Sequence, residues 1–102
     1  MNDLKNEDTD ELFDAIMNLK NKDECYNFFM DVCTVYEIID MSKRLKAAVL
    51  LDEGMSYKEI MQKVDVSTAT LSRISKSLKF GYGGYKKAIN AIAKKNQKNN
   101  IK

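Results

Sequence analysis

Apolar residues recur every three or four positions along most of this chain, which is the spacing of helices that bury one face. The first such run begins near Asp10, and the polar segment 21–23 ends it. A second run extends from about Asp23 to Ile39 and is unusually apolar. Its polar residues form only a thin stripe: Asn27, Asp31, Thr34 and Glu37. A helix that is apolar around most of its circumference must be buried nearly all round.

The length of the chain limits how that second helix can be covered. A chain of 102 residues has too little mass to surround such a helix while also completing its other faces. A second copy of the chain supplies the missing cover. We therefore predict an obligate, interlocked homodimer whose dimerisation helices span residues 10–39.

Two helices are expected in the middle of the chain. Ser42 can cap the first, which ends at the segment 52–54. Ser56 and Glu59 then have the spacing of a capping box, in which the serine oxygen and the glutamate carboxylate each satisfy a free amide at a helix start. The short helix that this box opens is expected to end at Asp65 and Val66.

The last two helices lie on either side of a glycine-rich segment. Ser67 can cap a helix that continues to about Phe80 and buries Leu71, Ile74 and Leu78. Gly81, which can take a positive φ, is expected to end this helix. A final amphipathic helix follows, and its apolar residues are Tyr85, Ala88, Ile89 and Ile92.

These patterns predict an all-α fold of about six helices in one domain, residues 1–102. The chain has no proline, the residue that most often interrupts helices. We expect residues 1–8 to be frayed and residues 94–102, rich in lysine and asparagine, to form a flexible basic tail.

The composition excludes most compact enzyme chemistries. The chain has no histidine, so it lacks a Ser/His/Asp or Cys/His nucleophile pair and a histidine-based metal site. We therefore expect no enzyme activity and no metal. Cys25 and Cys33 are expected to be buried thiols in a reducing cytosol. No secretory signal or membrane span is apparent, so we expect a cytoplasmic protein with no membrane contact.

Charge is divided unevenly along the chain. Residues 1–40 contain eleven acids and three bases, a net charge of −8, whereas residues 41–102 contain four acids and fourteen bases, a net charge of +10. The basic half suits a polyanion, of which nucleic acid is the usual example. The alternative is that the two halves of the chain simply attract each other.

Residues 56–79 have the layout of a helix-turn-helix, in which the second helix enters the DNA major groove and the first crosses the phosphates. Glycine is common in the turn, but Asp65 stands there, and aspartate is one of the residues that tolerate a left-handed conformation. The segment therefore remains compatible with this motif.

The predicted DNA-binding residues lie opposite the buried face of the second helix and on the helix before it. Thr68 and Ala69 can contact thymine methyl groups, and Ser72 can bind a base or a phosphate. Arg73 can bind a phosphate or a guanine edge. The full predicted set is Tyr57, Lys58, Gln62, Ser67, Thr68, Ala69, Ser72, Arg73, Lys76 and Lys79.

The segments 50–60 and 67–79 carry a family resemblance. The sequences LLDEGMSYKEI and STATLSRISKSLK resemble the helix-turn-helix region of the Trp repressor. They are still more similar to the Trp repressor-related (YerC/YecD-type) proteins of Gram-positive bacteria, in which a Gly-Tyr-Gly-Gly-Tyr-like segment also follows. The resemblance covers residues 40–85 well and the first helices by pattern only. It implies an all-helical, intertwined homodimer with two DNA-reading heads.

The same resemblance implies a candidate ligand pocket. Thr70, Arg73 and Ser77 match corepressor-pocket residues of the Trp repressor. Lys43, or Arg44 with a shift of one residue, matches the arginine that holds the ligand carboxylate. Ile74 stands where the repressor has glycine, and its branched side chain would fill part of the space beside the indole. We therefore expect no cofactor and no response to L-tryptophan; the protein binds DNA constitutively or answers to a different effector.

The sequence thus predicts a homodimeric transcriptional regulator, a repressor, that binds a palindromic operator in double-stranded DNA. Two alternatives remain. One is a protein-interaction module that docks a partner through the acidic half, and the other is a non-specific nucleic-acid binder without a regulatory ligand.

Overall fold

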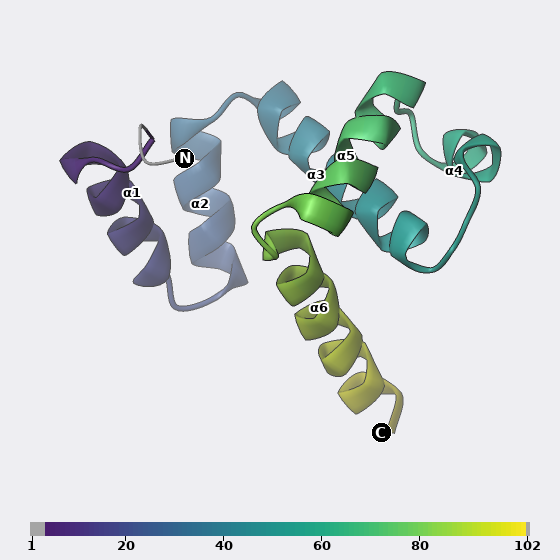
Figure 1. Cartoon of the computed structure of the whole chain (residues 1–102). Coiled ribbons are helices and arrows are strands. Elements are labelled where there is room, and N and C mark those ends of the chain that lie inside the picture. Colours follow the sequence, from purple (N-terminus) through teal and green to yellow (C-terminus); the bar gives the residue numbers. More distant parts are fainter. Residues whose placement is uncertain (1–3, 102) are drawn as a thin grey trace. The chain divides into compact units, whose positions relative to one another are not determined.

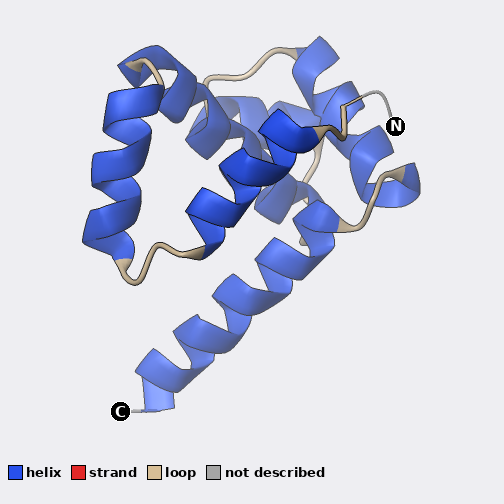
Figure 2. Ribbon diagram, turned by 90° about the vertical axis from the view of Figure 1, so that its left-hand side faces the viewer, coloured by secondary structure: helices blue, strands red, loops and turns tan. Residues whose placement is uncertain are grey.

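The computed structural model describes residues 4–101, which form six helices and no strand (Figure 2). The all-α prediction is confirmed for these residues. The helices are α1 (Glu7–Met17), α2 (Lys22–Val32), α3 (Val35–Asp52), α4 (Tyr57–Lys63), α5 (Thr68–Phe80) and α6 (Gly84–Ile101) (Figure 1).

The chain divides into two compact units, Met1–Ile38 and Ile39–Lys102. The first contains α1, α2 and the first turn of α3. The second contains the rest of α3 together with α4, α5 and α6. The helix-turn-helix segment therefore lies wholly within the second unit.

The boundary between α2 and α3 differs from the prediction. A single helix over 23–39 is wrong, because α2 ends at Val32 and Cys33 is extended. A capping box begins α3: the Thr34 amide donates to the Glu37 carboxylate at 2.8 Å, and the Glu37 amide donates to the Thr34 hydroxyl at 3.1 Å. These bonds with the backbone and side chain of Thr34 hold the pKa of Glu37 below its ordinary value.

Ser42 consequently has a different role from the predicted helix cap. It lies inside α3, and its hydroxyl donates to the Ile39 carbonyl oxygen at 2.7 Å. The helix ends as predicted, since Gly54 has φ +89° and its amide donates to Leu51 while the Met55 amide donates to Leu50. This pair of bonds is the Schellman arrangement, in which a left-handed glycine closes the helix.

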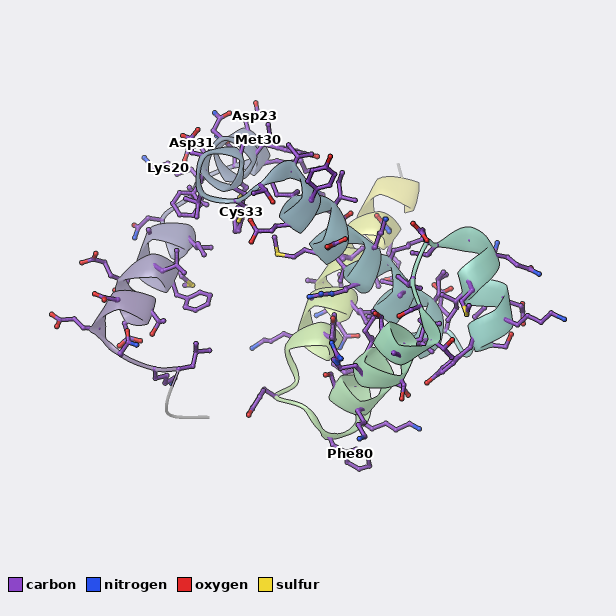
Figure 3. The ribbon with its side chains drawn as sticks, turned by 90° about the horizontal axis from the view of Figure 1, so that it is seen from above. Lys20, Asp23, Met30, Asp31, Cys33 and Phe80 are labelled. Carbon is purple, nitrogen blue, oxygen red and sulfur yellow. The ribbon has the colours of Figure 1, made fainter. Side chains whose placement is uncertain are left out.

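The helices of the first unit bury no residue within the chain. Neither α1 nor α2 contains a buried residue, although several of their apolar side chains are large. Phe13 is 56% exposed, Met17 83% and Tyr26 61%. Cys25 and Cys33 are free and only partly buried, so the prediction of buried thiols is not met within one chain; Figure 3 shows Cys33 where α2 ends.

The second unit has a core to which all four of its helices contribute. Ala47, Ala48 and Leu50 come from α3, and the other members are Ile60, Val64, Leu71, Ile74 and Ile89. An ion pair at 2.6 Å between Lys86 and Asp52 also joins α6 to the end of α3. This core fixes α4 and α5 against α3.

The glycine that takes a positive φ after α5 is Gly83, at +81°, and not Gly81. Gly81 caps the end of α5, as predicted, but its φ is −82°, so it does not use the positive φ that glycine allows. It is required for a steric reason instead, because a Cβ atom there would overlap the Ser77 carbonyl oxygen.

The two ends of the chain also differ from the sequence-based expectation. Asn6 caps α1, which begins at Glu7 within the segment expected to be frayed. At the other end α6 continues to Ile101, through most of the segment predicted to be a flexible tail. Residues 1–3 and Lys102 lie outside the described residues.

Candidate nucleic-acid interface

A serine cap starts each helix of the helix-turn-helix. The Ser56 hydroxyl accepts the Glu59 amide at 3.2 Å and donates to the Glu59 carboxylate at 3.0 Å. The serine half of the predicted capping box is therefore present, but the glutamate binds the serine hydroxyl in place of the serine amide. The Ser67 hydroxyl accepts the Thr70 amide at 3.1 Å and fixes the start of α5.

The turn between these helices has an extended backbone. Val64 caps α4 with φ −132°, and the Val66 amide donates to the Val64 carbonyl oxygen at 2.9 Å. Among the described residues only glycines have a positive φ, so the left-handed conformation suggested for Asp65 does not occur. Because no residue of this turn has a positive φ, the turn does not need the usual glycine.

The two faces of α5 are sharply different. Leu71 is fully buried and Ile74 is 3% exposed, while Leu78 packs on the same core. All six predicted contact residues on the opposite side are exposed: Thr68, Ala69, Ser72, Arg73, Lys76 and Lys79. The helix therefore presents small residues near its amino end and cations farther along.

The flanking predicted residues are placed less uniformly. Lys58, Gln62 and Ser67 are exposed, but the Ser67 hydroxyl is already bonded to the amide and the hydroxyl of Thr70. Tyr57 is half-buried and packs against the core of the second unit. Its ring therefore contributes to packing, and the side chain is only partly accessible to a ligand.

The predicted pocket residues meet at a cavity of about 110 Å³ between α3, α5 and α6. Arg44, Thr70, Arg73, Ile74 and Ser77 line it. Of the two alternatives for the carboxylate position, the structure brings Arg44 to this cavity. Lys43 lines an adjacent cavity of about 170 Å³ together with Arg44 and Thr70.

One residue of the small cavity is absent from the predicted set. Tyr85, from the first turn of α6, completes its lining. The sequence indicates only a helix stop in the glycine-rich segment before it. Tyr85 also lines a larger apolar cavity of about 460 Å³ with Leu45, Tyr82 and Ala88.

An ion pair connects α3 to the helix-turn-helix. Lys43 Nζ lies 3.4 Å from Asp65 Oδ2, across 22 positions of sequence. Periodicity could not have revealed this contact, because it depends on how α3 packs against the turn. At the other end of α5, Phe80 projects outward and is 84% exposed (Figure 3).

Within residues 4–101 there is no group of three or more acidic, cysteine or histidine side chains arranged to hold a metal ion. No helix of the described chain combines the length and hydrophobicity needed to cross a membrane.

Comparison with known proteins places these features in a family context. The sequence profile of the Trp repressor protein family matches residues 7–93. The uncharacterized protein YerC of Bacillus subtilis is 39% identical over 89 residues, which are 87% of this chain and 86% of that protein.

Two solved structures are similar along nearly their whole length. A candidate Trp repressor of Staphylococcus aureus has a TM-score of 0.84 and 43% identity, with 89% of this chain and 91% of that one covered. A TrpR-like protein of Eubacterium eligens has a TM-score of 0.87 and 42% identity, with coverage of 91% and 96%.

Proposed function

This chain belongs to the Trp repressor family of helix-turn-helix DNA-binding regulators, and from that premise we propose that it represses transcription by binding a palindromic operator as a homodimer. The observation that carries the proposal is the division of α5 into a buried face around Leu71 and Ile74 and an exposed face of hydroxyl, methyl and cationic groups. Such a helix is held rigidly on one side and is free to enter a major groove on the other.

Each proposed DNA contact follows from the chemistry of the side chain that makes it. Thr68, Ala69 and Ser72 lie near the amino end of α5, where short side chains allow close approach to base edges. Lys76 and Lys79 bind phosphates, and Arg73 binds a phosphate or a guanine edge. Lys58, Gln62 and Ser67, with the hydroxyl of Tyr57, hold the neighbouring backbone.

The homodimer accounts for the uncovered apolar surface of the first unit. Phe13, Met17 and Tyr26 are each more than half exposed in the single chain, and water-facing side chains of that size contribute nothing to stability. A second copy removes them from water and places two copies of α5 about one helical turn (~34 Å) apart, the spacing of an operator's half-sites.

The oligomeric state is tested by sedimentation equilibrium across a range of protein concentrations. We expect a dimer mass for the wild type and dissociation or loss of folding for Phe13→Asp. Asp14→Asn, which changes an exposed neighbour on the same helix, serves as the matched control. A folded wild-type monomer would contradict the dimer.

We further propose that L-tryptophan is not the effector. Ile74 is 3% exposed and forms part of the wall of the small cavity, so its side chain occupies space that an indole needs. The protein then acts in the cytoplasm either constitutively or with an effector other than L-tryptophan. Isothermal titration is expected to show no saturable binding of L-tryptophan, and micromolar binding would refute this point.

The function itself is tested by selecting bound duplexes from a random DNA library with the purified full chain. We expect an enriched palindrome both with and without L-tryptophan. A reporter gene carrying that palindrome in its promoter should be expressed less when the protein is present. Salt-insensitive binding to a protein through the acidic half, with no enriched DNA, would favour the interaction-module alternative.

A further inference from the structure

Asp65 is an unexpected residue beside a DNA-reading helix. It is the last acid in the chain, since residues 66–102 contain nine lysines and arginines and no aspartate or glutamate. It stands two residues before Ser67, the cap of α5, and its side chain is 94% exposed. An unpaired carboxylate at this place would repel the phosphates of an approaching duplex.

Lys43 approaches Asp65 from α3. Its Nζ atom lies 3.4 Å from Asp65 Oδ2, and its side chain is only 33% exposed. A lysine can bury its aliphatic stem along a surface while its ammonium group stays in water. The aliphatic part of Lys43 is therefore partly buried, and its ammonium group extends to the turn that contains Asp65.

The charges around this pair are balanced. Asp40 and Arg44 line the same cavity as Lys43 and Asp65, so the cavity contains two acids and two bases. It offers no net positive charge to a small anion. The pair is better explained by its effect on the neighbouring helix than as a ligand site.

We propose that Lys43 is a positioning residue that acts on DNA binding through Asp65. It holds the Asp65 carboxylate at the turn and neutralises it, so that the amino end of α5 meets the duplex without an unpaired negative charge. This inference rests on the proposed DNA-binding function. It assigns Lys43 a role in DNA binding by the helix-turn-helix. This role is separate from binding a ligand carboxylate, which the family resemblance implies for Lys43.

A double-mutant cycle distinguishes this role from direct phosphate binding by Lys43. Affinity for the selected duplex is measured by fluorescence anisotropy at two salt concentrations for K43M, D65N and K43M/D65N. We expect K43M to weaken binding about threefold when Asp65 is present, the scale of an exposed ion pair. In the D65N background K43M should change affinity by less than about half that factor.

Lys46 supplies the matched control, because it is an exposed lysine on the same helix. K46M should have the same effect with and without D65N, as expected for an independent charge. The conservative variant K43R should retain wild-type affinity, and urea unfolding should show that K43M is folded.

An equal cost of K43M in both backgrounds would overturn the proposal and identify Lys43 as an independent cation. A loss of DNA affinity in the single variant D65N would also overturn the proposal, because the carboxylate would then be needed for binding. If the wild type binds no DNA, the proposed function fails and this inference fails with it. Wild-type binding without coupling between the two residues removes only this inference.

Discussion

Replacement of Ile74 by alanine tests whether the second unit, which contains the helix-turn-helix, is stabilised by its own hydrophobic core. Ile74 is 3% exposed within the core of the second unit. The change removes three buried carbon atoms, which at about 0.8 kcal/mol each amount to about 2.4 kcal/mol of lost transfer free energy. The cavity left behind adds to this, so the free energy of unfolding should fall by about 3 kcal/mol.

Urea unfolding followed by far-ultraviolet circular dichroism measures this loss. Protein concentration must be the same for each variant, because the stability of the proposed dimer would depend on it. Met61→Ala is the matched control: it removes the same number of non-hydrogen atoms from α4, but from a side chain that is 44% exposed. It should cost less than about 1 kcal/mol.

Equal losses for Ile74→Ala and Met61→Ala would refute the reasoning. Ile74 would then not be packed as the structure has it, and the space beside it would be open to a ligand. Isothermal titration of the wild type with amino acids would then test for an effector.

Three further predictions concern the interface, the glycine segment and the start of α3. Arg73→Ala and Lys76→Ala should each weaken binding to the selected duplex and lower the slope of log affinity against log salt by about one; an unchanged slope in anisotropy titrations would contradict phosphate contact. Gly81→Ala should lower the urea midpoint, because its Cβ atom overlaps the Ser77 carbonyl, whereas Gly84→Ala meets open space and should leave the midpoint unchanged or raised. The pKa of Glu37 is lowered by its bonds to Thr34, so its contribution to stability is present at neutral pH and is lost as pH falls through that pKa. Glu37→Gln should remove this part of the acid sensitivity, and an unshifted Glu37 carboxyl in an NMR titration would be the contrary result.

The helix-turn-helix could be predicted from the sequence because local signals fix both of its helices. Ser56 and Ser67 each cap a helix at the predicted position. The spacing of Leu71, Ile74 and Leu78 identifies the buried face correctly. Capping and periodicity depend on residues a few positions apart, so both can be recognised in a single sequence.

The start of α3 also has a local sequence signal, but the continuous apolar pattern around it favours a single helix. Thr34 and Glu37 have the same spacing as Ser56 and Glu59, which is the spacing of a capping box. Apolar residues continue on both sides of Thr34 without a break in periodicity, so the pattern favoured one helix where the structure has two. The capping pair is the better guide here, because α2 ends at Val32 and the two bonds between Thr34 and Glu37 begin a new helix.

The residues around the small cavity could be predicted only in part. The family resemblance offers Lys43 or Arg44 on α3, and Arg44 lines the cavity. Thr70, Ile74 and Ser77 recur at helical spacing on α5, and the family resemblance identifies them. Tyr85 and the contact between Lys43 and Asp65 come from other elements, and their positions depend on how α3 and α6 pack. No local pattern encodes such packing.

Adjacent residues of α5 connect the core to the proposed DNA contacts. Ile74 is buried, and Arg73, directly before it, is exposed. Both also line the small cavity, so we expect the packing of Ile74 to influence the position of Arg73. Under our proposal, Ile74 packs in the core and fills space that the Trp repressor leaves open with a glycine. The orientation of Arg73 toward DNA is then set by folding of the chain itself, which is why we expect operator binding without tryptophan.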